Sequence, residues 1–363
     1  MSSNPPIATC TVITRSYLGD VRALVRTLRR WHPDARPYVL VIDGPGGKFD
    51  PALEDFTVLG IADLDLPDAR AFCFQYTAFE LCNALKVHLL RHVLEVRGEP
   101  AALYLDGDLG VYAPLDELWG QVLAHDVLLT PHATRPFPAD GHFPHDLGLL
   151  AAGAYNAGVL GVRSSGEGPL FLEWWARGVR HDCVDDRSNG LYVDQKYLDL
   201  VPGFFPGAAV LRHDGVNVAH FNLHQRRVHG ADGRWRVNEV PLLLFHFTQI
   251  RHREGTFWPP VSRPFPEQQE ALRGLFASYL ADLEAVGWAG CRTWDYGLSH
   301  FDSGRPISPA TRVAFRKGWV AGGTPGDPYA SPEWEAFERG LRWREWPRRA
   351  VRFIRRLGRR QHP

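Results

Sequence analysis

Apolar runs in the first half of the chain follow two different periods. Ile7–Thr14 and Tyr38–Ile42 are rich in β-branched and apolar residues and predict strands, whereas apolar residues recur at helical spacing from Val21 to Trp31. This strand–helix–strand opening favours a parallel, doubly wound sheet. The same patterning predicts further apolar segments at 57–61, 101–105, 126–130, 156–162, 208–211, 216–221 and 242–247, and a long helix over about 76–96.

The pattern changes after about residue 250. From Pro264 onward, apolar residues such as Leu272, Leu275 and Leu283 recur at helical spacing. We therefore expect three parts: a sheet-containing domain over residues 1–250, a mostly helical cap over 251–330, and a basic amphipathic tail over 331–363. The fold class predicted from this order is α/β with a C-terminal helical extension.

The tail carries most of the charge asymmetry of a chain whose formal net charge is zero. Between Arg339 and Arg360 there are ten arginines and one glutamate, beside an apolar stripe that includes Trp343 and Trp346. This pattern suits the surface of an anionic membrane, and it suits equally a solvated helix or one packed on the body. No base-reading motif accompanies the arginines, so we expect no nucleic-acid partner.

The remaining composition is typical of a soluble globular enzyme, with 45% hydrophobic and 23% charged residues. Five scattered cysteines without a Cys-x-x-Cys pair predict reduced thiols rather than a disulfide framework or a zinc site. The first residues show no signal peptide, and no apolar run is long enough to span a membrane. We therefore expect a cytoplasmic protein, peripheral at the inner membrane surface if the tail binds lipid.

Two carboxylates at the end of a predicted strand are the strongest chemical signal. The apolar run Ala101–Leu105 ends in Asp106-Gly107-Asp108. Ligands in open α/β sheets bind beyond the carboxyl ends of the strands, so a site is expected here. Two carboxylates spaced by a glycine suit a hard divalent cation, Mn²⁺ or Mg²⁺, that bridges to phosphate oxygens. The glycine fingerprints of dinucleotide-binding and nucleoside-triphosphatase loops are absent.

Three further polar residues each allow two interpretations. Lys86 lies among apolar positions of the predicted helix and is either a solvated residue or a ligand-binding one. Asp194 precedes a predicted helix and is either its cap or a site residue. His246 near the end of the 242–247 strand is either a hydrogen-bonded core residue or a metal ligand. The histidines of the 131–148 loop (His132, His142 and His145) match no standard metal spacing and are expected at the surface, in a loop that covers substrate.

Five sequence blocks together resemble a known enzyme class. They are Leu81-Cys-Asn-Ala-Leu-Lys86, Tyr104-Leu-Asp-Gly-Asp-Leu-Gly-Val111, Tyr155-Asn-Ala-Gly-Val159, Val193-Asp-Gln195 and Phe245-His-Phe247. In this order they resemble bacterial glycosyltransferases of the GT-A fold, with the closest likeness to glycosyltransferase family 8 and related nucleotide-diphospho-sugar transferases. The later blocks Asn217–His224 and Phe301–Gly304 are similar to a bacterial subgroup of poorly defined substrate.

The resemblance implies a fold and a set of site residues. The fold would be a GT-A-like, Rossmann-type mixed sheet flanked by helices, with residues 1–250 as the nucleotide-sugar-binding catalytic domain. Asp106 and Asp108 would hold Mn²⁺ or Mg²⁺ on the donor diphosphate, and His246 would complete the metal site. Donor binding is implied for Thr14, Arg15, Asp43, Lys86 and Gly158, and the first three of these would lie near the base. The catalytic pocket for sugar and acceptor would contain Asn156, Asp194 and Gln195.

One departure concerns the diphosphate. The family follows its His-Phe pair with a Lys-Pro-Trp that clamps the diphosphate, whereas this chain continues Thr248-Gln249-Ile250-Arg251. Arg251 or Arg253 is the candidate replacement for that lysine.

The implied reaction is metal-dependent transfer of a sugar from a nucleotide-diphosphate sugar, with a UDP-sugar favoured, to an acceptor hydroxyl. Bacterial surface glycans, glycolipids and lipid-linked acceptors are the expected acceptor classes. A retaining enzyme, which the family likeness favours, needs no strong base because the leaving phosphate oxygen takes the acceptor proton. An inverting enzyme needs a carboxylate base, and Asp194 is then the candidate.

Two alternatives remain open from the sequence. A non-catalytic protein of the same fold would bind nucleotide sugars or glycans without turnover. A phosphatase of the haloacid dehalogenase type also begins with Asp-x-Asp after an apolar strand, and there the first aspartate is a nucleophile. That motif carries Thr or Val where this chain has Gly110, and it lies near the chain start, whereas two predicted strand–helix units precede Asp106 here.

Overall fold

The computed structural model describes residues 4–140, 145–249, 251–253, 256–258, 264–323 and 326–340. The strands are β1 (Ala8–Ile13), β2 (Arg36–Val41), β3 (Thr57–Leu59), β4 (Ala101–Leu105), β5 (Leu109–Val111), β6 (Val127–Pro131), β7 (Tyr155–Arg163), β8 (Asp185–Asp186), β9 (Leu191–Tyr192), β10 (Ala208–Val210), β11 (Val228–Ala231), β12 (Arg234–Val237), β13 (Val240–Pro241), β14 (Leu244–His246), β15 (Arg251–Arg253) and β16 (Thr256–Trp258).

The α-helices are α1 (Leu18–Arg29), α2 (Ala69–Phe74), α3 (Ala78–Ala84), α4 (Lys86–Arg91), α5 (Asp116–Ala124), α6 (Asp146–Ala152), α7 (Gly168–Asp182), α8 (Val201–Phe204), α9 (Gln269–Ala285), α10 (Trp288–Cys291), α11 (Pro309–Val320) and α12 (Pro332–Gly340). Among the described residues, no helix is both long enough and apolar enough to cross a membrane.

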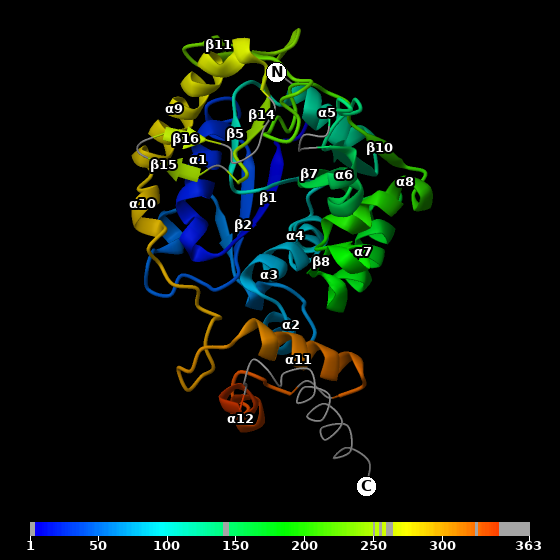
Figure 1. The fold of residues 1–363 in the computed structure, drawn as a ribbon, viewed down its shortest axis with the longest axis vertical. Coiled ribbons are helices and arrows are strands. Elements are labelled where there is room, and N and C mark those ends of the chain that lie inside the picture. The colour runs from blue at the N-terminus through cyan, green and yellow to red at the C-terminus, as the bar shows by residue number, and fades with distance from the viewer. Residues whose placement is uncertain are drawn as a thin grey trace.

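A mixed sheet forms the centre of the molecule (Figure 1). Its seven strands lie in the order β10-β6-β7-β4-β1-β2-β3. β1 pairs in parallel with β2 and β4, whereas β7 runs antiparallel between β4 and β6. The antiparallel strand has a structural consequence, because its first residues lie at the edge where β1, β2 and β4 end. The predicted α/β class and the mixed sheet are confirmed.

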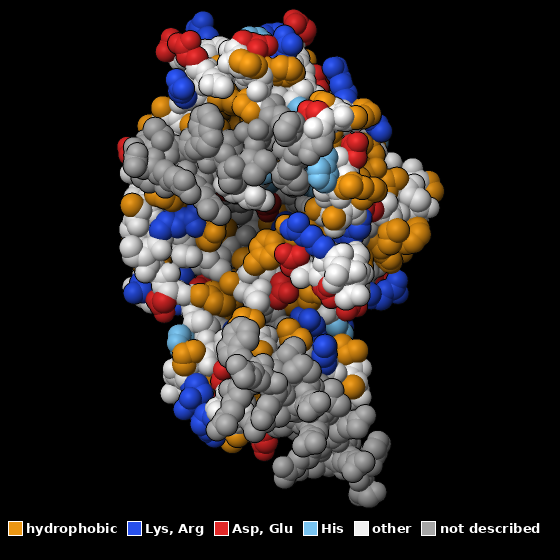
Figure 2. Space-filling model, in the orientation of Figure 1, with side chains coloured by type: hydrophobic (Ala, Val, Ile, Leu, Met, Phe, Trp, Pro, Cys, Tyr) orange, Lys and Arg blue, Asp and Glu red, His pale blue; other side chains and the backbone are white. Residues whose placement is uncertain are grey.

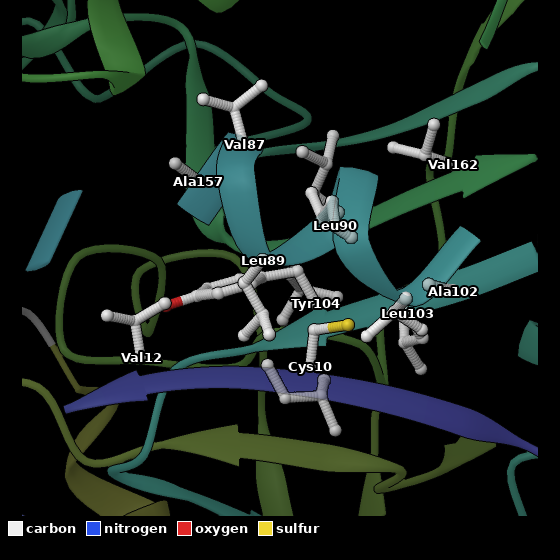
Figure 3. Packing of buried hydrophobic residues seen from close by; sticks show 14 of the residues in the cluster. Cys10, Val12, Val87, Leu89, Leu90, Ala102, Leu103, Tyr104, Ala157 and Val162 are labelled. Atoms are coloured by element: carbon white, nitrogen blue, oxygen red, sulfur yellow. The ribbon is translucent and has the colours of Figure 1, made fainter. Parts of the chain in front are cut away.

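Helices cover both faces of this sheet. Alternate residues of β1 point to opposite faces, so Cys10 and Val12 pack in one cluster with Leu89 and Leu90 of α4, as Figure 3 shows. Ile13 packs on the other face in a cluster with Val21 and other apolar residues of α1. Because both faces are covered, β1 and β4 are buried along their whole length, which explains their continuous apolar runs.

The predicted long helix over 76–96 is wrong as a single element. Thr77 and Glu80 form a reciprocal capping box at the start of α3, which separates it from α2. α3 ends at Ala84, and Leu85, whose φ of −87° and ψ of −7° depart from regular helix, separates it from α4. A π-helical turn over His92–Val96 follows α4. Lys86 is therefore the first residue of a new helix, and it is buried.

A second, two-stranded sheet joins β14, from late in the sequence, to β5, which follows the two aspartates. β14 pairs antiparallel with β5, and His246 lies opposite Leu109. The predicted strand over 242–247 is thus shorter than expected and belongs to this small sheet. The apolar segment 216–221 forms no strand, although Val218 makes one isolated bridge to Phe245.

The C-terminal region is helical, as predicted. α9 packs against α1, and α11 and α12 share an apolar cluster with Phe74 of α2. Figure 1 places α11 and α12 together at one end of the molecule. Most of the predicted basic tail lies outside the described residues, so its membrane contact stays a prediction.

Candidate functional site

Asp106, Asp108 and His246 form a cluster beyond the carboxyl end of β4. One ligand atom from each lies within 4.8 Å of the others. His246 Nε2 is 3.0 Å from Asp108 Oδ1 and 3.7 Å from Asp106 Oδ2. The two carboxylates are about 30% exposed, whereas the imidazole is buried. The pairing of β14 with β5 creates this arrangement, because it brings His246 next to the residue that follows Asp108.

The three side chains fit a hard divalent cation. Two carboxylates are oxygen donors that both Mn²⁺ and Mg²⁺ prefer, and Mn²⁺ accepts the imidazole nitrogen more readily than Mg²⁺ does. Gly158 provides the space, because a Cβ at this position would lie 2.6 Å from both Asp106 Oδ2 and His246 Cε1. Burial disfavours the charged forms of His246 and Asp108, but their mutual attraction outweighs it. The pKa of His246 is therefore raised and that of Asp108 is lowered.

Lys86 lies between two carboxylates on the other side of this cluster. Its Nζ is 3.3 Å from Asp106 Oδ1 and 3.5 Å from Asp194 Oδ2, and it lies 4.8 Å from the ring centre of Tyr104. Burial disfavours the ammonium, yet the two carboxylates prevail and the pKa of Lys86 is raised. Of the two interpretations of Lys86, the solvated helix residue is wrong.

Asp194 is a buried carboxylate with few partners. Its side chain is 0% exposed, and among the described residues neither oxygen accepts a hydrogen bond. Burial raises the pKa of Asp194 to about 6, against the attraction of Lys86 and with a contribution from Asp106. Its side chain does not cap the following 3₁₀ helix, Gln195–Leu200, so the capping interpretation is wrong.

A chain of amides connects the remaining predicted residues. Asn156 Nδ2 donates to Gln195 Oε1 at 3.2 Å, and Gln195 Nε2 donates to the Ala152 carbonyl at 2.9 Å. Asn156 Nδ2 also lies 3.2 Å from His132 Nε2. Burial lowers the pKa of His132 to about 4, so this imidazole is neutral and accepts the hydrogen bond. The prediction that His132 is a surface residue is wrong, and His142 lies outside the described residues.

These residues line one pocket of about 230 Å³. Its walls come from α3, α6, β7 and the loop after β9, and its lining includes Lys86, Asp106, Asn156, Gly158, Asp194, Gln195 and His246. Figure 2 shows this face hollowed near its centre, with acidic and basic side chains close together around the hollow. The pocket is therefore contiguous with the candidate cation site through Asp106 and His246.

Thr14, Arg15 and Asp43 do not line this pocket. They lie at the neighbouring ends of β1 and β2, where Asp43 accepts hydrogen bonds from the backbone N–H groups of Arg15 and Gly297. Arg15 Nε donates to the Asp295 carbonyl and lies 3.5 Å from Asp43. The side chain of Asp43 is 0% exposed. Base contact by these residues stays a prediction.

Asn217 is the residue that sequence reasoning missed. Its Oδ1 lies 3.0 Å from His246 Nδ1, and its Nδ2 donates to Asn156 Oδ1 at 3.0 Å. It belongs to the Asn217–His224 block, but no spacing rule links residue 217 to residue 246. The only local signal is its position after Asp214-Gly215, a turn sequence.

Comparisons with known proteins add the following. No family model matches the sequence. Two Bacillus subtilis (strain 168) proteins are similar to it: the uncharacterized protein YfnF is 26% identical over 248 residues, which is 67% of this chain and 82% of YfnF, and the uncharacterized protein YfnD is 23% identical over 247 residues, which is 66% of this chain and 76% of YfnD.

Three of the similar solved structures are described as glycosyltransferases. The galactosyltransferase LgtC, in complex with donor and acceptor sugar analogues, is 12% identical with a TM-score of 0.43, covering 78% of this chain and all of LgtC. GlyE of Streptococcus pneumoniae TIGR4 is 15% identical with a TM-score of 0.40, covering 81% of this chain and 67% of GlyE. The bifunctional WbbM is 12% identical with a TM-score of 0.43, covering 79% and 52%. The family 8 assignment stays a prediction.

Proposed function

We propose that this protein is a metal-dependent glycosyltransferase that moves a sugar from a nucleotide-diphosphate sugar to an acceptor hydroxyl. The observation that carries the proposal is the Asp106–Asp108–His246 cluster, which opens onto a pocket shared with Lys86 and Asp194. A bound Mn²⁺ or Mg²⁺ would supply positive charge where a diphosphate leaves. The pocket combines a candidate metal site with the buried ammonium of Lys86. This arrangement suits a phosphate-bearing donor better than a neutral ligand.

Lys86 would stabilise negative charge on the donor. Its ammonium is buried and held by Asp106, Asp194 and the Ala157 carbonyl, so it needs no reorganisation when charge develops beside it. Asn156 and Gln195 would orient the sugar in the pocket. Gly158 would keep the backbone clear of the donor and the cation, because any side chain there meets Asp106 and His246.

We propose a retaining reaction in which the leaving phosphate oxygen accepts the acceptor proton. Two features support this reaction over one that uses a carboxylate base or a covalent sugar–enzyme intermediate. Asp194 is fully buried and paired with Lys86, which makes it a poor base for a hydroxyl arriving from solvent. The oxygen of Gln195 already accepts from Asn156 Nδ2 and from the Ala157 N–H, so it is not a free nucleophile.

The finer assignments are part of the same proposal. Residues 1–250 would be the catalytic domain, 251–330 its helical cap and 331–363 a basic tail. A UDP-sugar is the favoured donor, and a bacterial surface glycan or a glycolipid is the favoured acceptor. A lipid-linked acceptor at the inner membrane surface would give the arginines of the tail a function.

The test is a screen of nucleotide sugars with and without Mn²⁺, read by thermal shift and by sugar release. A ligand of the folded protein raises the unfolding midpoint according to its affinity. We expect one nucleotide to give a Mn²⁺-dependent shift and slow sugar release. Asp108→Asn should reduce release by about 100-fold or more, as expected when a group that stabilises the leaving charge is lost. Asp116→Asn, an exposed aspartate of α5, serves as the matched control. Shift without any release, with every acceptor tried, would favour a binding protein instead.

A further inference from the structure

Asn217 occupies a constrained position behind the candidate cation site. Its side chain is buried completely, and its backbone has a φ of 56°, a conformation that asparagine tolerates better than most residues. Asn222 holds this conformation, because its Nδ2 donates to the Asn217 carbonyl and its Oδ1 accepts from the Ala219 N–H, both at 3.0 Å. The surrounding structure therefore fixes both the backbone and the direction of the Asn217 side chain.

The hydrogen bonds around Asn217 also fix which of its two side-chain atoms faces His246. Asn156 Oδ1 accepts from the Gly158 N–H at 3.0 Å, so this atom is an oxygen and the atom of Asn217 that approaches it must be the donor Nδ2. Oδ1 of Asn217 consequently faces His246 Nδ1, which must carry a proton to complete the bond. His246 Nε2 is then the nitrogen that faces Asp106 and Asp108.

We propose that Asn217 is a positioning residue of the cation site: it holds the Nδ1–H tautomer and ring orientation of His246, and it ties that histidine through Asn156 to Gln195 of the sugar pocket. The proposal rests on the proposed function for the identity of the bound cation. An acceptor behind a ligating imidazole orients the ring and raises its basicity, and losing such a partner typically lowers metal affinity 10- to 100-fold. Asn217 touches neither donor nor acceptor in this scheme.

The first test compares two asparagine-to-glycine substitutions. Asn217→Gly removes the amide, while glycine keeps the positive φ without strain. Asn238→Gly is the matched control, because Asn238 also has a positive φ of 50° and an amide bonded to Asp214 and Gln225, away from the cluster. Mn²⁺ binding to the full chain is measured by electron paramagnetic resonance of the free ion, without any donor. We expect Asn217→Gly to weaken Mn²⁺ binding about tenfold or more, and Asn238→Gly to leave it within twofold.

Two further variants separate positioning from a general loss of structure. Asn217→Asp restores an acceptor for His246 Nδ1–H but not a donor for Asn156, so Mn²⁺ affinity should return to at least about a third of the wild-type value or exceed it. Asn156→Ala removes the link to the sugar pocket but leaves the acceptor on Asn217, so it should weaken Mn²⁺ binding by only about threefold. Thermal midpoints are recorded for every variant.

Four results would overturn the inference. Asn217→Gly binding Mn²⁺ as tightly as the wild type would show that His246 needs no partner. Equal losses in Asn217→Gly and Asn238→Gly, or no recovery in a folded Asn217→Asp, would mean that Asn217 acts through the fold alone. Absence of Mn²⁺ binding to the wild type would remove the inference together with the metal part of the proposed function, and this outcome is distinct because it appears before any substitution is made.

Discussion

Two groups of predicted site residues lie along the same edge of the sheet and differ in how completely their polar atoms are paired. At the end of β4, Lys86 is shared by Asp106 and Asp194, and the oxygens of Asp194 accept no hydrogen bond from the described residues. At the ends of β1 and β2, Asp43 accepts two backbone hydrogen bonds and forms an ion pair with Arg15. Arg15 also donates a hydrogen bond to the carbonyl of Asp295.

This difference gives a criterion for recognising a functional site among buried polar groups. Buried polar atoms are almost always paired, so a group that is buried and incompletely paired beside a pocket is arranged for something other than stability. By this criterion the β4 end is the open half of the edge and the β1–β2 end is the closed half. Substitutions in the open half should change cation binding and turnover, whether or not they also lower stability, whereas those in the closed half should change stability alone.

Lys86→Met should cause the largest loss of stability in the open half. It leaves Asp106 and Asp194 without their cation, and breaking a buried pair in this way costs about 3–5 kcal/mol of unfolding free energy. Donor hydrolysis should fall at the same time, by about tenfold or more. Denaturant unfolding and sugar release measure the two effects. Unchanged stability would show that the two carboxylates do not depend on Lys86.

Gly158→Ala should impair the open half through contact rather than charge. The added Cβ would lie 2.6 Å from Asp106 Oδ2 and from His246 Cε1, so both ligands must move. We expect Mn²⁺ affinity to fall about tenfold, as for other disturbances of ligand orientation. Gly120→Ala in α5 is the matched control, because no heavy atom lies within 4 Å of its added Cβ. Equal Mn²⁺ affinity in the two variants would contradict the close approach at Gly158.

Asp43→Asn should affect the closed half only. The substitution removes the charge that pairs with Arg15 and turns one acceptor oxygen into a donor that faces an N–H group. A loss of about 1–3 kcal/mol of unfolding free energy is expected for such an unsatisfied buried group. The KM for the nucleotide-sugar donor should change less than about threefold, a difference worth under about 1 kcal/mol. A tenfold rise in KM with unchanged stability would instead support contact of Asp43 with the base.

The smallest effect concerns the pH dependence of stability. The pKa of Asp194 is about 6 in the folded protein and about 3.8 for an ordinary aspartate. Between these two pH values, Asp194 therefore holds a proton in the folded protein that it loses in the unfolded chain. The contribution of Asp194 to stability is therefore greatest below about pH 4 and is lost as the pH rises through about 6.

Asp194→Asn removes this dependence. Measured in EDTA, its thermal midpoint relative to the wild type should rise by a few degrees between about pH 4.5 and about pH 7. A gap that stays constant over this range would mean that Asp194 is ionised throughout.

The sequence predicted those parts of the site that depend on local pattern. The strand Ala101–Leu105 and its two terminal aspartates are predicted from the sequence, because an apolar run that ends in carboxylates is visible without tertiary information. For His246 the pattern alone leaves two interpretations, and only the family resemblance implies a metal ligand. The burial of Lys86 was not predicted. It depends on a break between α3 and α4 that helical spacing conceals, since Leu81, Leu85 and Leu89 continue the same apolar stripe across it.

The other contacts that the sequence does not predict depend on pairing between distant segments of the chain. Asn217 contacts His246 because the neighbouring Val218 forms a backbone bridge to Phe245 of β14. The Arg15–Asp43 pair is covered by residues 295–297, more than 250 positions away along the chain. Neither contact leaves a periodic signal in the sequence. The same holds for His132, whose burial beside Asn156 depends on packing from distant segments.

The most direct test of the open half is calorimetric titration of the wild type and Asp108→Asn with a nucleoside diphosphate, in Mn²⁺ and in EDTA. The account predicts one site per chain that requires Mn²⁺ and is lost in the folded Asp108→Asn variant. Binding of the same affinity in EDTA, or in Asp108→Asn, would contradict the claim that Asp106, Asp108 and His246 hold the cation on the donor diphosphate.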